Sequence, residues 1–225
     1  MKNLFSSLRL VAGLLGLASI VATFFDTASR VAINPFNFFG FFTMQSNIIF
    51  MVVMFVTAIR GFRRVASSAR FDVIRGCATT YIVIVGVVYN TLLAGLEGGV
   101  TLAWANTILH VFLPIYAAID WVIFSDRSAL RWRLLWVALI YPIVWVIVVL
   151  IRGATDGWVP YPFLDPTLGY PVVSLYCVGI AVGTIGVASA VWMISRVRII
   201  GAPAVPPNEA AVASSGDAPV IVTKR

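Results

Sequence analysis

Charged side chains are scarce in this sequence, and their scarcity excludes a soluble fold. Only 11% of the 225 residues are charged, whereas about 25% is usual for soluble domains. Hydrophobic residues make up 60% of the chain, and the mean hydropathy is +0.97. Such a chain has too few polar side chains to cover a surface in water, and its high hydrophobicity also excludes intrinsic disorder. The composition therefore predicts a polytopic membrane protein.

Histidine and cysteine are almost absent, which narrows the chemistry that the chain can support. The two cysteines, Cys77 and Cys177, provide no disulfide framework and no metal-finger spacing. They fall at opposite depths of the predicted spans, so we expect them not to pair. The single histidine, His110, excludes electron carriers whose haem needs two axial histidines, and it excludes a histidine-rich zinc site. We expect no metal and no organic cofactor.

Long apolar runs dominate what the sequence does contain. Six of them approach the length that crosses about 30 Å of hydrocarbon as a helix. They are residues 10–25, 38–59, 73–96, 101–124, 132–151 and 171–194. Each run is continuous rather than alternating, which disfavours an outer-membrane barrel. The sequence predicts an all-α fold, a bundle of six transmembrane helices over residues 1–200, followed by a disordered cytoplasmic tail over residues 201–225.

The basic residues are distributed unevenly between the predicted loops. Fourteen of the sixteen fall at the termini and in the second and fourth loops, and only Arg30 and Arg152 fall on the other side. Because basic loops stay in the cytoplasm, both termini are predicted to be cytoplasmic. The formal charge of +7 is explained by the orientation of the protein in the membrane, so no nucleic-acid partner is expected. The first run follows Lys2 and Arg9 as in a signal peptide, but no small-x-small cleavage site comes after it, and we interpret it as a retained span.

Polar residues of three consecutive spans fall at a similar depth in the outer leaflet. Thr43 and Asn47 are four residues apart in the second span, so they share one helix face. Asn106 and His110 have the same spacing in the fourth span, and Asn90 is at a matching depth in the third. Polar groups in hydrocarbon tend to face the bundle interior, and consecutive helices are usually neighbours. We therefore predict one shared polar pocket.

A hydroxyl beside a neutral imidazole is the minimum for nucleophilic acyl transfer. Thr43 is the hydroxyl closest in depth to His110, with Ser46 as an alternative. Three amides are candidates to orient the imidazole or to donate to an oxyanion: Asn47, Asn90 and Asn106. The competing interpretation is structural, because Thr, Ser and Asn in membrane helices commonly hydrogen-bond a backbone carbonyl and do nothing else.

The last outer loop, residues 153–170, is rich in aromatic residues and proline. One interpretation is a rigid lid over the polar pocket, formed by Trp158, Tyr161, Phe163 and Asp165. The other is an ordinary aromatic belt, since such side chains concentrate at the membrane interface.

Four other residues carry structural expectations. Asp120, near the cytoplasmic end of the fourth span, is expected at the interface or paired with an arginine. Gly179 and Gly183 in the sixth span have the spacing of a small-xxx-small packing face. Pro114 is expected to kink the fourth span, and a polar cavity would help to satisfy the carbonyls that it frees.

Three segments together resemble the androgen-induced-gene-one-like membrane proteins, most closely the bacterial branch of that family. They are Phe-Phe-Thr-Met-Gln-Ser-Asn at 41–47, His-Val-Phe-Leu-Pro at 110–114 and Trp-Val-Pro-Tyr-Pro-Phe-Leu-Asp at 158–165. The resemblance implies six spans and a bacterial plasma membrane. For the animal members it implies a threonine hydrolase that cleaves fatty acid esters of hydroxy fatty acids with an intramembrane threonine and histidine. Carried over by motif, these residues are Thr43 and His110.

The leading hypothesis is therefore an intramembrane hydrolase of lipid esters, with Thr43 as nucleophile and His110 as general base. The alternative is a non-enzymatic lipid-binding or structural membrane protein. A transporter is disfavoured because no internal repeat is visible, and a membrane protease because its motifs are missing. The expected partners are the lipid bilayer and a lipid ester, and the sequence indicates no oligomeric state.

Overall fold

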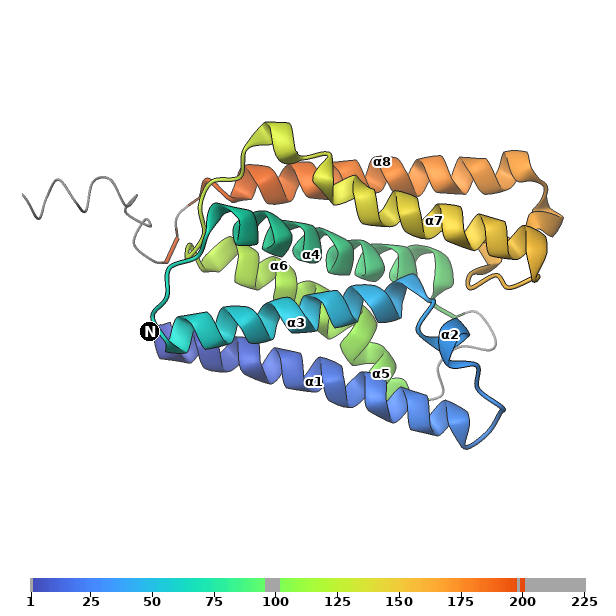
Figure 1. The fold of residues 1–225 in the computed structure, drawn as a ribbon, viewed down its shortest axis with the longest axis horizontal. Helices are drawn as coiled ribbons and strands as arrows, with labels where there is room; N and C mark the ends of the chain where they lie inside the picture. Colours follow the sequence, from blue (N-terminus) through green and yellow to red (C-terminus); the bar gives the residue numbers. More distant parts are fainter. Residues whose placement is uncertain (1, 96–101, 198, 201–225) are drawn as a thin grey trace, which may run out of the picture.

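The computed structural model describes residues 2–95, 102–197 and 199–200, and this part of the chain is helical (Figure 1). The elements are α1 (Lys2–Ala28), α2 (Pro35–Phe38), α3 (Phe42–Phe62), α4 (Ala69–Val88), α5 (Ala103–Thr107), α6 (Leu113–Ile123), α7 (Val137–Thr155) and α8 (Tyr170–Ile194). A π-helical turn, Tyr89–Leu93, extends α4, and a second, Ile108–Phe112, joins α5 to α6. The only β-type pairing in the described ranges is an isolated bridge between Phe124 and Ile200.

Six of the helical segments are long and apolar enough to cross a membrane, which confirms the all-α, six-span prediction. The chain is a multi-pass membrane protein. The first span differs most from its predicted bounds, because α1 already begins at Lys2. Arg9 lies inside this helix with 1% of its surface exposed, and its charge is paired with carboxylates of the fourth span and the loop after it. The predicted span began after Arg9 because an unpaired charge is unfavourable in hydrocarbon. Since Arg9 is paired, the helix can include it.

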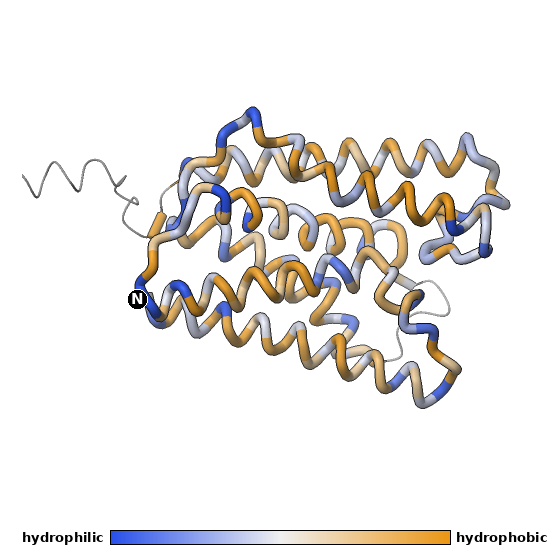
Figure 2. Tube along the Cα trace, viewed as in Figure 1, coloured by the Kyte–Doolittle hydropathy of each residue, from blue (hydrophilic) through white to orange (hydrophobic). Residues whose placement is uncertain are grey.

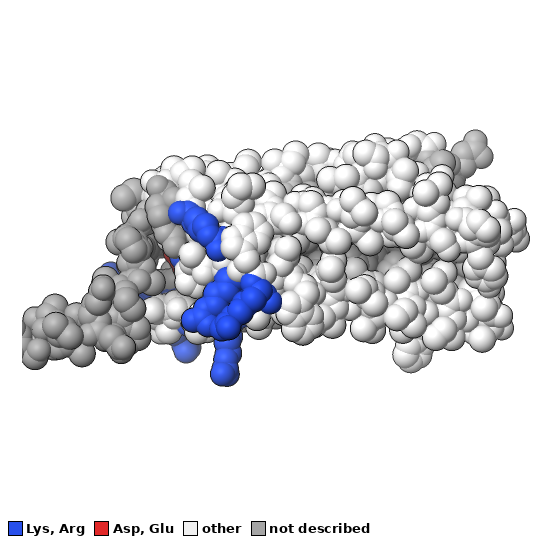
Figure 3. All heavy atoms as spheres, turned by 90° about the horizontal axis from the view of Figure 1, so that it is seen from above, with Lys and Arg blue, Asp and Glu red and all other residues white. Residues whose placement is uncertain are grey.

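Both ends of the described chain lie at the same end of the bundle, as an even number of spans requires (Figure 1). The lysines and arginines visible in Figure 3 gather at that end. The positive-inside rule assigns this end to the cytoplasm. The predicted tail, residues 201–225, lies outside the described residues.

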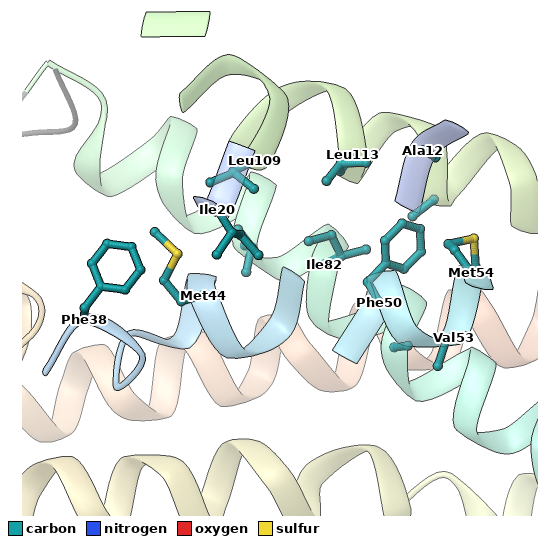
Figure 4. Close-up of a cluster of buried hydrophobic side chains, with 13 residues drawn as sticks. Ala12, Ile20, Phe38, Met44, Phe50, Val53, Met54, Ile82, Leu109 and Leu113 are labelled. Carbon is teal, nitrogen blue, oxygen red and sulfur yellow. The ribbon is translucent and has the colours of Figure 1, made fainter. Parts of the chain in front are cut away.

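Helix α4 is the centre of the bundle and packs against α3, α6, α7 and α8, while α1 packs mainly against α3. Apolar side chains from α1, α3, α4 and the fourth span meet in one interior cluster, which includes Phe50, Ile82 and Leu113 (Figure 4). Helix α7 is different, because only Ala138 and Val149 on it are buried. Figure 2 colours most of this helix as hydrophobic, and its exposed side chains include Ile140, Val144 and Ile147, as expected of a helix in contact with lipid. In a bilayer the contacts between the helices are stabilised by close packing rather than by the expulsion of water.

An ion cluster joins three segments at the cytoplasmic end; three of its members are buried, whereas 46% of the Asp126 side chain is exposed. The Arg9 guanidinium donates to Asp120 at 2.7 Å and to Asp126, and Arg75 donates to Asp126 at 3.1 Å. Asp120 is 3% exposed and also lies 3.5 Å from Arg75. The expected pairing of Asp120 with an arginine is therefore confirmed, and the cluster links α1 to α4 and α6.

The glycines of the sixth span pack against no helix of the described chain. A Cβ built on Gly179 or on Gly183 would meet no atom within 4 Å, so this face of α8 packs against no other described part of the chain. The small residues leave that face smooth, and the packing face expected there stays a prediction. The two cysteines are unpaired, as predicted.

Candidate functional site

Thr43 lies in the first turn of α3 and is held by a tyrosine of the outer loop. Its backbone N–H, which has no partner within the helix, donates to the Tyr161 hydroxyl at 3.2 Å. The two side-chain oxygens, Thr43 Oγ1 and Tyr161 Oη, are 3.3 Å apart. Because the Tyr161 hydroxyl already accepts the N–H, its own proton is available to Thr43 Oγ1 or to an oxygen that takes its place. Burial raises the pKa of Tyr161, so the phenol stays protonated.

The outer loop covers this threonine with aromatic rings. Tyr161 stacks on Phe163 and meets Phe41 edge to face, and all three belong to one packed group. Trp158 reaches over Gly40, where an added Cβ would lie 2.6 Å from the indole ring. Three of the four predicted lid residues therefore lie over the outer end of α3.

Asp165, the fourth predicted lid residue, does not join this group. Its carboxylate accepts the Thr167 N–H at 2.8 Å, which lowers the pKa of Asp165 and starts a short 3₁₀ turn. It is therefore a capping residue at the membrane surface.

Below the loop lies an elongated apolar cavity of about 150 Å³. Its walls come from α4, α7 and α8, and its outer end is formed by the loop and the first turn of α3. The lining residues are Phe42, Thr43, Ile84, Val85, Val88, Tyr89, Leu93, Leu139, Pro142, Ile143, Trp145, Val146, Tyr161, Phe163, Leu164, Cys177, Ile180, Ala181, Thr184 and Ile185. Thr43 and Tyr161 thus place a hydrogen-bonded hydroxyl pair at one end of a hydrocarbon-lined space.

His110 lies in the π-helical turn of the fourth span and is 5% exposed. Its Nδ1 is 3.1 Å from the backbone carbonyl of Asn106. A carbonyl only accepts, so Nδ1 carries the proton of the neutral ring and the lone pair is on Nε2. The Tyr89 ring stacks on the imidazole with centroids 3.9 Å apart. Tyr89 lines the cavity and His110 does not, so the tyrosine ring lies between His110 and the cavity.

The asparagines serve the backbone around Pro114. Proline has no N–H to give to the preceding turn, which leaves the His110 carbonyl without its helical donor. The π-helical turn redirects the N–H of the residue before the proline, so the Leu109 carbonyl also lacks its helical donor. Asn90 Nδ2 donates to His110 O at 3.2 Å, and Asn47 Nδ2 reaches Leu109 O at 3.5 Å. The freed carbonyls are therefore satisfied by side chains of neighbouring helices and not by the polar cavity that was expected.

A glycine allows this approach of α4 to the fourth span. A Cβ on Gly86 would lie 2.6 Å from Pro114 Cβ, so only glycine lets the two backbones come so close. The carbonyl of Gly86 also accepts from Asn90 Nδ2 at 2.8 Å.

The described structure does not show the predicted shared polar pocket, because the cavity is apolar and Thr43 is the only one of the sequence-predicted polar residues that lines it. The two principal residues are not connected either. No hydrogen bond joins Thr43 to His110 among the described contacts. Their link is indirect. Asn47 Nδ2 donates to the Thr43 carbonyl at 2.9 Å and also reaches the carbonyl of Leu109, the residue before His110. Ser46 is fully buried and lies away from the cavity lining. Asn106 donates through Nδ2 to the Tyr89 hydroxyl, and its Oδ1 has no partner among the described residues.

Sequence reasoning missed the direct bond from Tyr161 to Thr43 and the stacking of Tyr89 on His110. Tyr89 was signalled by its position next to Asn90. Nothing in the sequence pairs Tyr161 with Thr43, because the two are 118 positions apart and one lies in a loop.

Within the described ranges, no three His, Cys, Asp or Glu side chains gather where they could share a metal ion. Comparison with protein-family models, curated proteins and solved structures found no match for the chain.

Proposed function

We propose that this protein is an intramembrane hydrolase of lipid esters, with Thr43 as the nucleophile. The observation that carries the proposal is the position of the Thr43 hydroxyl, which lies at the closed end of an apolar cavity and is paired with a neutral tyrosine. An ester with its hydrocarbon in the cavity would place its carbonyl beside this hydroxyl. The resemblance of the segments around Thr43, His110 and Tyr161 to the androgen-induced-gene-one-like proteins supports the same chemistry, and with it a bacterial plasma membrane location.

In the proposed reaction, Thr43 Oγ1 attacks the ester carbonyl carbon and its proton passes to His110 Nε2. The Tyr161 hydroxyl donates to the oxyanion, a role for which a preorganised buried phenol is suited. The protonated imidazole then gives its proton to the departing alkoxide, which leaves an acyl-threonine and a free alcohol. Attack by water on the acyl-threonine, with the same residues acting again, releases the acid.

This assignment requires movement of Tyr89, whose ring separates His110 from the cavity. Catalytic hydrogen bonds are often long or absent without substrate and form only in the complex. We therefore propose that an occupied cavity displaces the Tyr89 ring and exposes Nε2 to the Thr43 hydroxyl.

A second candidate is lipid binding without turnover. One observation favours it, the lack of any hydrogen bond between Thr43 and His110 in the described structure. In that case the Thr43–Tyr161 pair would hold the head group of a lipid, and the asparagines would only satisfy the kinked fourth span.

Labelling with a fluorophosphonate, which reacts with activated hydroxyl groups, distinguishes the two candidates. We expect the purified protein to be labelled and to hydrolyse a long-chain fatty acid ester, and we expect both activities to be lost in Thr43→Ala and in His110→Ala. Thr57→Ala is the matched control, since Thr57 is a buried threonine of the same helix that bonds only the carbonyl four residues before it. A folded wild-type protein that neither reacts nor hydrolyses would exclude the hydrolase and leave the binding protein.

A further inference from the structure

The cavity has the dimensions of a site for one hydrocarbon chain. Its lining spans residues 84–93 on the third span, 139–146 on α7 and 177–185 on α8. At 1.5 Å per helical residue, all three walls give a length of roughly 10–14 Å parallel to the bundle axis. A volume of about 150 Å³ over this length leaves room for one hydrocarbon chain and not for two lying side by side.

Both ends of the cavity are closed. Tyr161, Phe163 and Leu164 form the outer end, and each is at most 9% exposed. At the inner end Thr184 is 2% exposed, and its hydroxyl donates to the Ile180 carbonyl rather than into the cavity. A chain would therefore meet hydrogen-bonding groups at its outer end and only apolar surface at its inner end.

The side of the cavity is open to the lipid. Ile143 of α7 and Ile185 of α8 line it, yet 50% and 42% of their surfaces are exposed. Between the same helices, Ala181 also lines the cavity and is exposed. A ligand can thus enter from the membrane between α7 and α8 without crossing the closed outer loop.

We infer that the ligand is a single-chain lipid of limited length, which enters sideways between α7 and α8 and places its polar group beneath Tyr161. We expect two-chain phospholipids not to fit, because the cavity has room for one chain and the buried outer loop leaves no space for a glycerophosphate head group beside it. The identity of the polar group as an ester rests on the proposed function, whereas the selection of one chain of a given length does not.

Chain length should produce an optimum rather than a steady rise in affinity. Moving a chain from the bilayer into this cavity exchanges one hydrocarbon environment for another, so added methylenes gain no hydrophobic transfer energy. A chain that is too short leaves an empty volume at the inner end, which is unfavourable. A chain that is too long cannot pass the closed inner end around Thr184.

Cys177 offers a direct measurement of occupancy, because its side chain lines the cavity while Cys77 is buried elsewhere. The purified protein, in a sterol-based detergent whose rigid rings are too wide for the cavity, would be alkylated with N-ethylmaleimide and the label on Cys177 followed by mass spectrometry. Saturated fatty acids from hexanoic to octadecanoic acid and a diacyl phosphatidylcholine would be added as competitors. We expect protection to pass through a maximum within the series and the two-chain lipid to give none.

Two variants locate the chain. Thr184→Met fills the inner end and should move the maximum to shorter acids. Ala181→Leu narrows the side opening and should weaken protection by every acid. Val182→Leu is the matched control for both, since Val182 is a neighbouring, lipid-exposed residue outside the lining, and it should leave the protection pattern unchanged.

Protection that is equal for all chain lengths, protection by the two-chain lipid, or no protection by any acid would each overturn the inference. The result is separate from the proposed function. A length optimum in a protein that hydrolyses no ester would reject the hydrolase and keep the chain site, whereas hydrolysis with no length optimum and no effect of Thr184→Met would do the reverse.

Discussion

At the residue scale, the Tyr161 hydroxyl is the group on which the candidate site depends. It accepts the otherwise unpaired Thr43 N–H and faces the Thr43 hydroxyl, so one phenol orders both the helix start and the nucleophile. Because Tyr161 satisfies the buried N–H of Thr43, it contributes to folding whether or not the protein is an enzyme. A test of its role must therefore separate stability from turnover.

Tyr161→Phe removes only this hydroxyl. Leaving a buried N–H without a partner should lower the free energy of unfolding by about 1–3 kcal/mol. If the phenol also donates to the oxyanion, kcat should fall roughly 10²–10³-fold with little change in KM. Thermal unfolding and steady-state hydrolysis by the purified variant measure the two effects.

Tyr141→Phe is the control for that substitution. Tyr141 belongs to the same group of rings, and its hydroxyl donates to Gln45 at 3.2 Å outside the cavity lining. We expect some loss of stability with kcat unchanged. Equal losses of kcat in the two variants would contradict a direct role for Tyr161.

At the element scale, the fourth span is interrupted where it meets the third. Its π-helical turn precedes Pro114, and a second π-helical turn carries Tyr89 and Asn90 on the facing helix. Such turns occur frequently at functional sites because they re-aim side chains and release backbone groups. Here they place the His110 carbonyl against Asn90 and the His110 ring against Tyr89.

A double-mutant cycle measures how proline and asparagine depend on each other. Asn90→Leu should cost about 0.5–2 kcal/mol, in the range of hydrogen bonds between membrane helices. In a Pro114→Ala background the alanine N–H can serve the His110 carbonyl, so the same substitution should cost less. The coupling energy comes from unfolding of the four proteins in detergent with a chemical denaturant. Additive effects would show that the asparagine does not serve the proline-freed carbonyl.

At the scale of the whole molecule, the ion cluster at the cytoplasmic end joins three segments through three buried charges and the half-exposed Asp126. Arg9, Arg75, Asp120 and Asp126 contribute two charges of each sign. Apolar helices in lipid can slide or rotate at little cost, whereas buried charges must meet their partners. The cluster therefore specifies the register of α1 against α4 and α6.

Breaking one pair in this cluster should be costly, and removing both partners should be less so. Asp120→Leu leaves Arg9 and Arg75 to share Asp126, and Arg9→Met leaves both carboxylates to share Arg75. Each single variant therefore leaves the cluster with one excess charge, which is expected to lower the free energy of unfolding by about 3 kcal/mol. The double variant keeps Arg75 with Asp126 and should recover a large part of that loss. Denaturant unfolding in detergent measures all three. A double variant as unstable as the sum of the singles would contradict the pairing.

The sequence by itself determined the fold class and the topology. Composition, run length and the distribution of arginines require no knowledge of side-chain packing, because hydrocarbon imposes helices of a minimum length and a cytoplasmic side for positive charge. The depth of Thr43, Asn47, Asn90 and His110 followed from the same geometry, since the rise per residue is constant along a helix.

Tertiary structure alone decided which of these polar groups touch. Depth along a span says nothing about rotation around it, and a loop residue such as Tyr161 has no helical register at all. Only the packed bundle shows that Tyr161 bonds Thr43, that Tyr89 separates His110 from the cavity, and that the glycines of α8 face away from every described helix. These contacts depend on the positions of several helices at once, which is information that no single stretch of sequence contains.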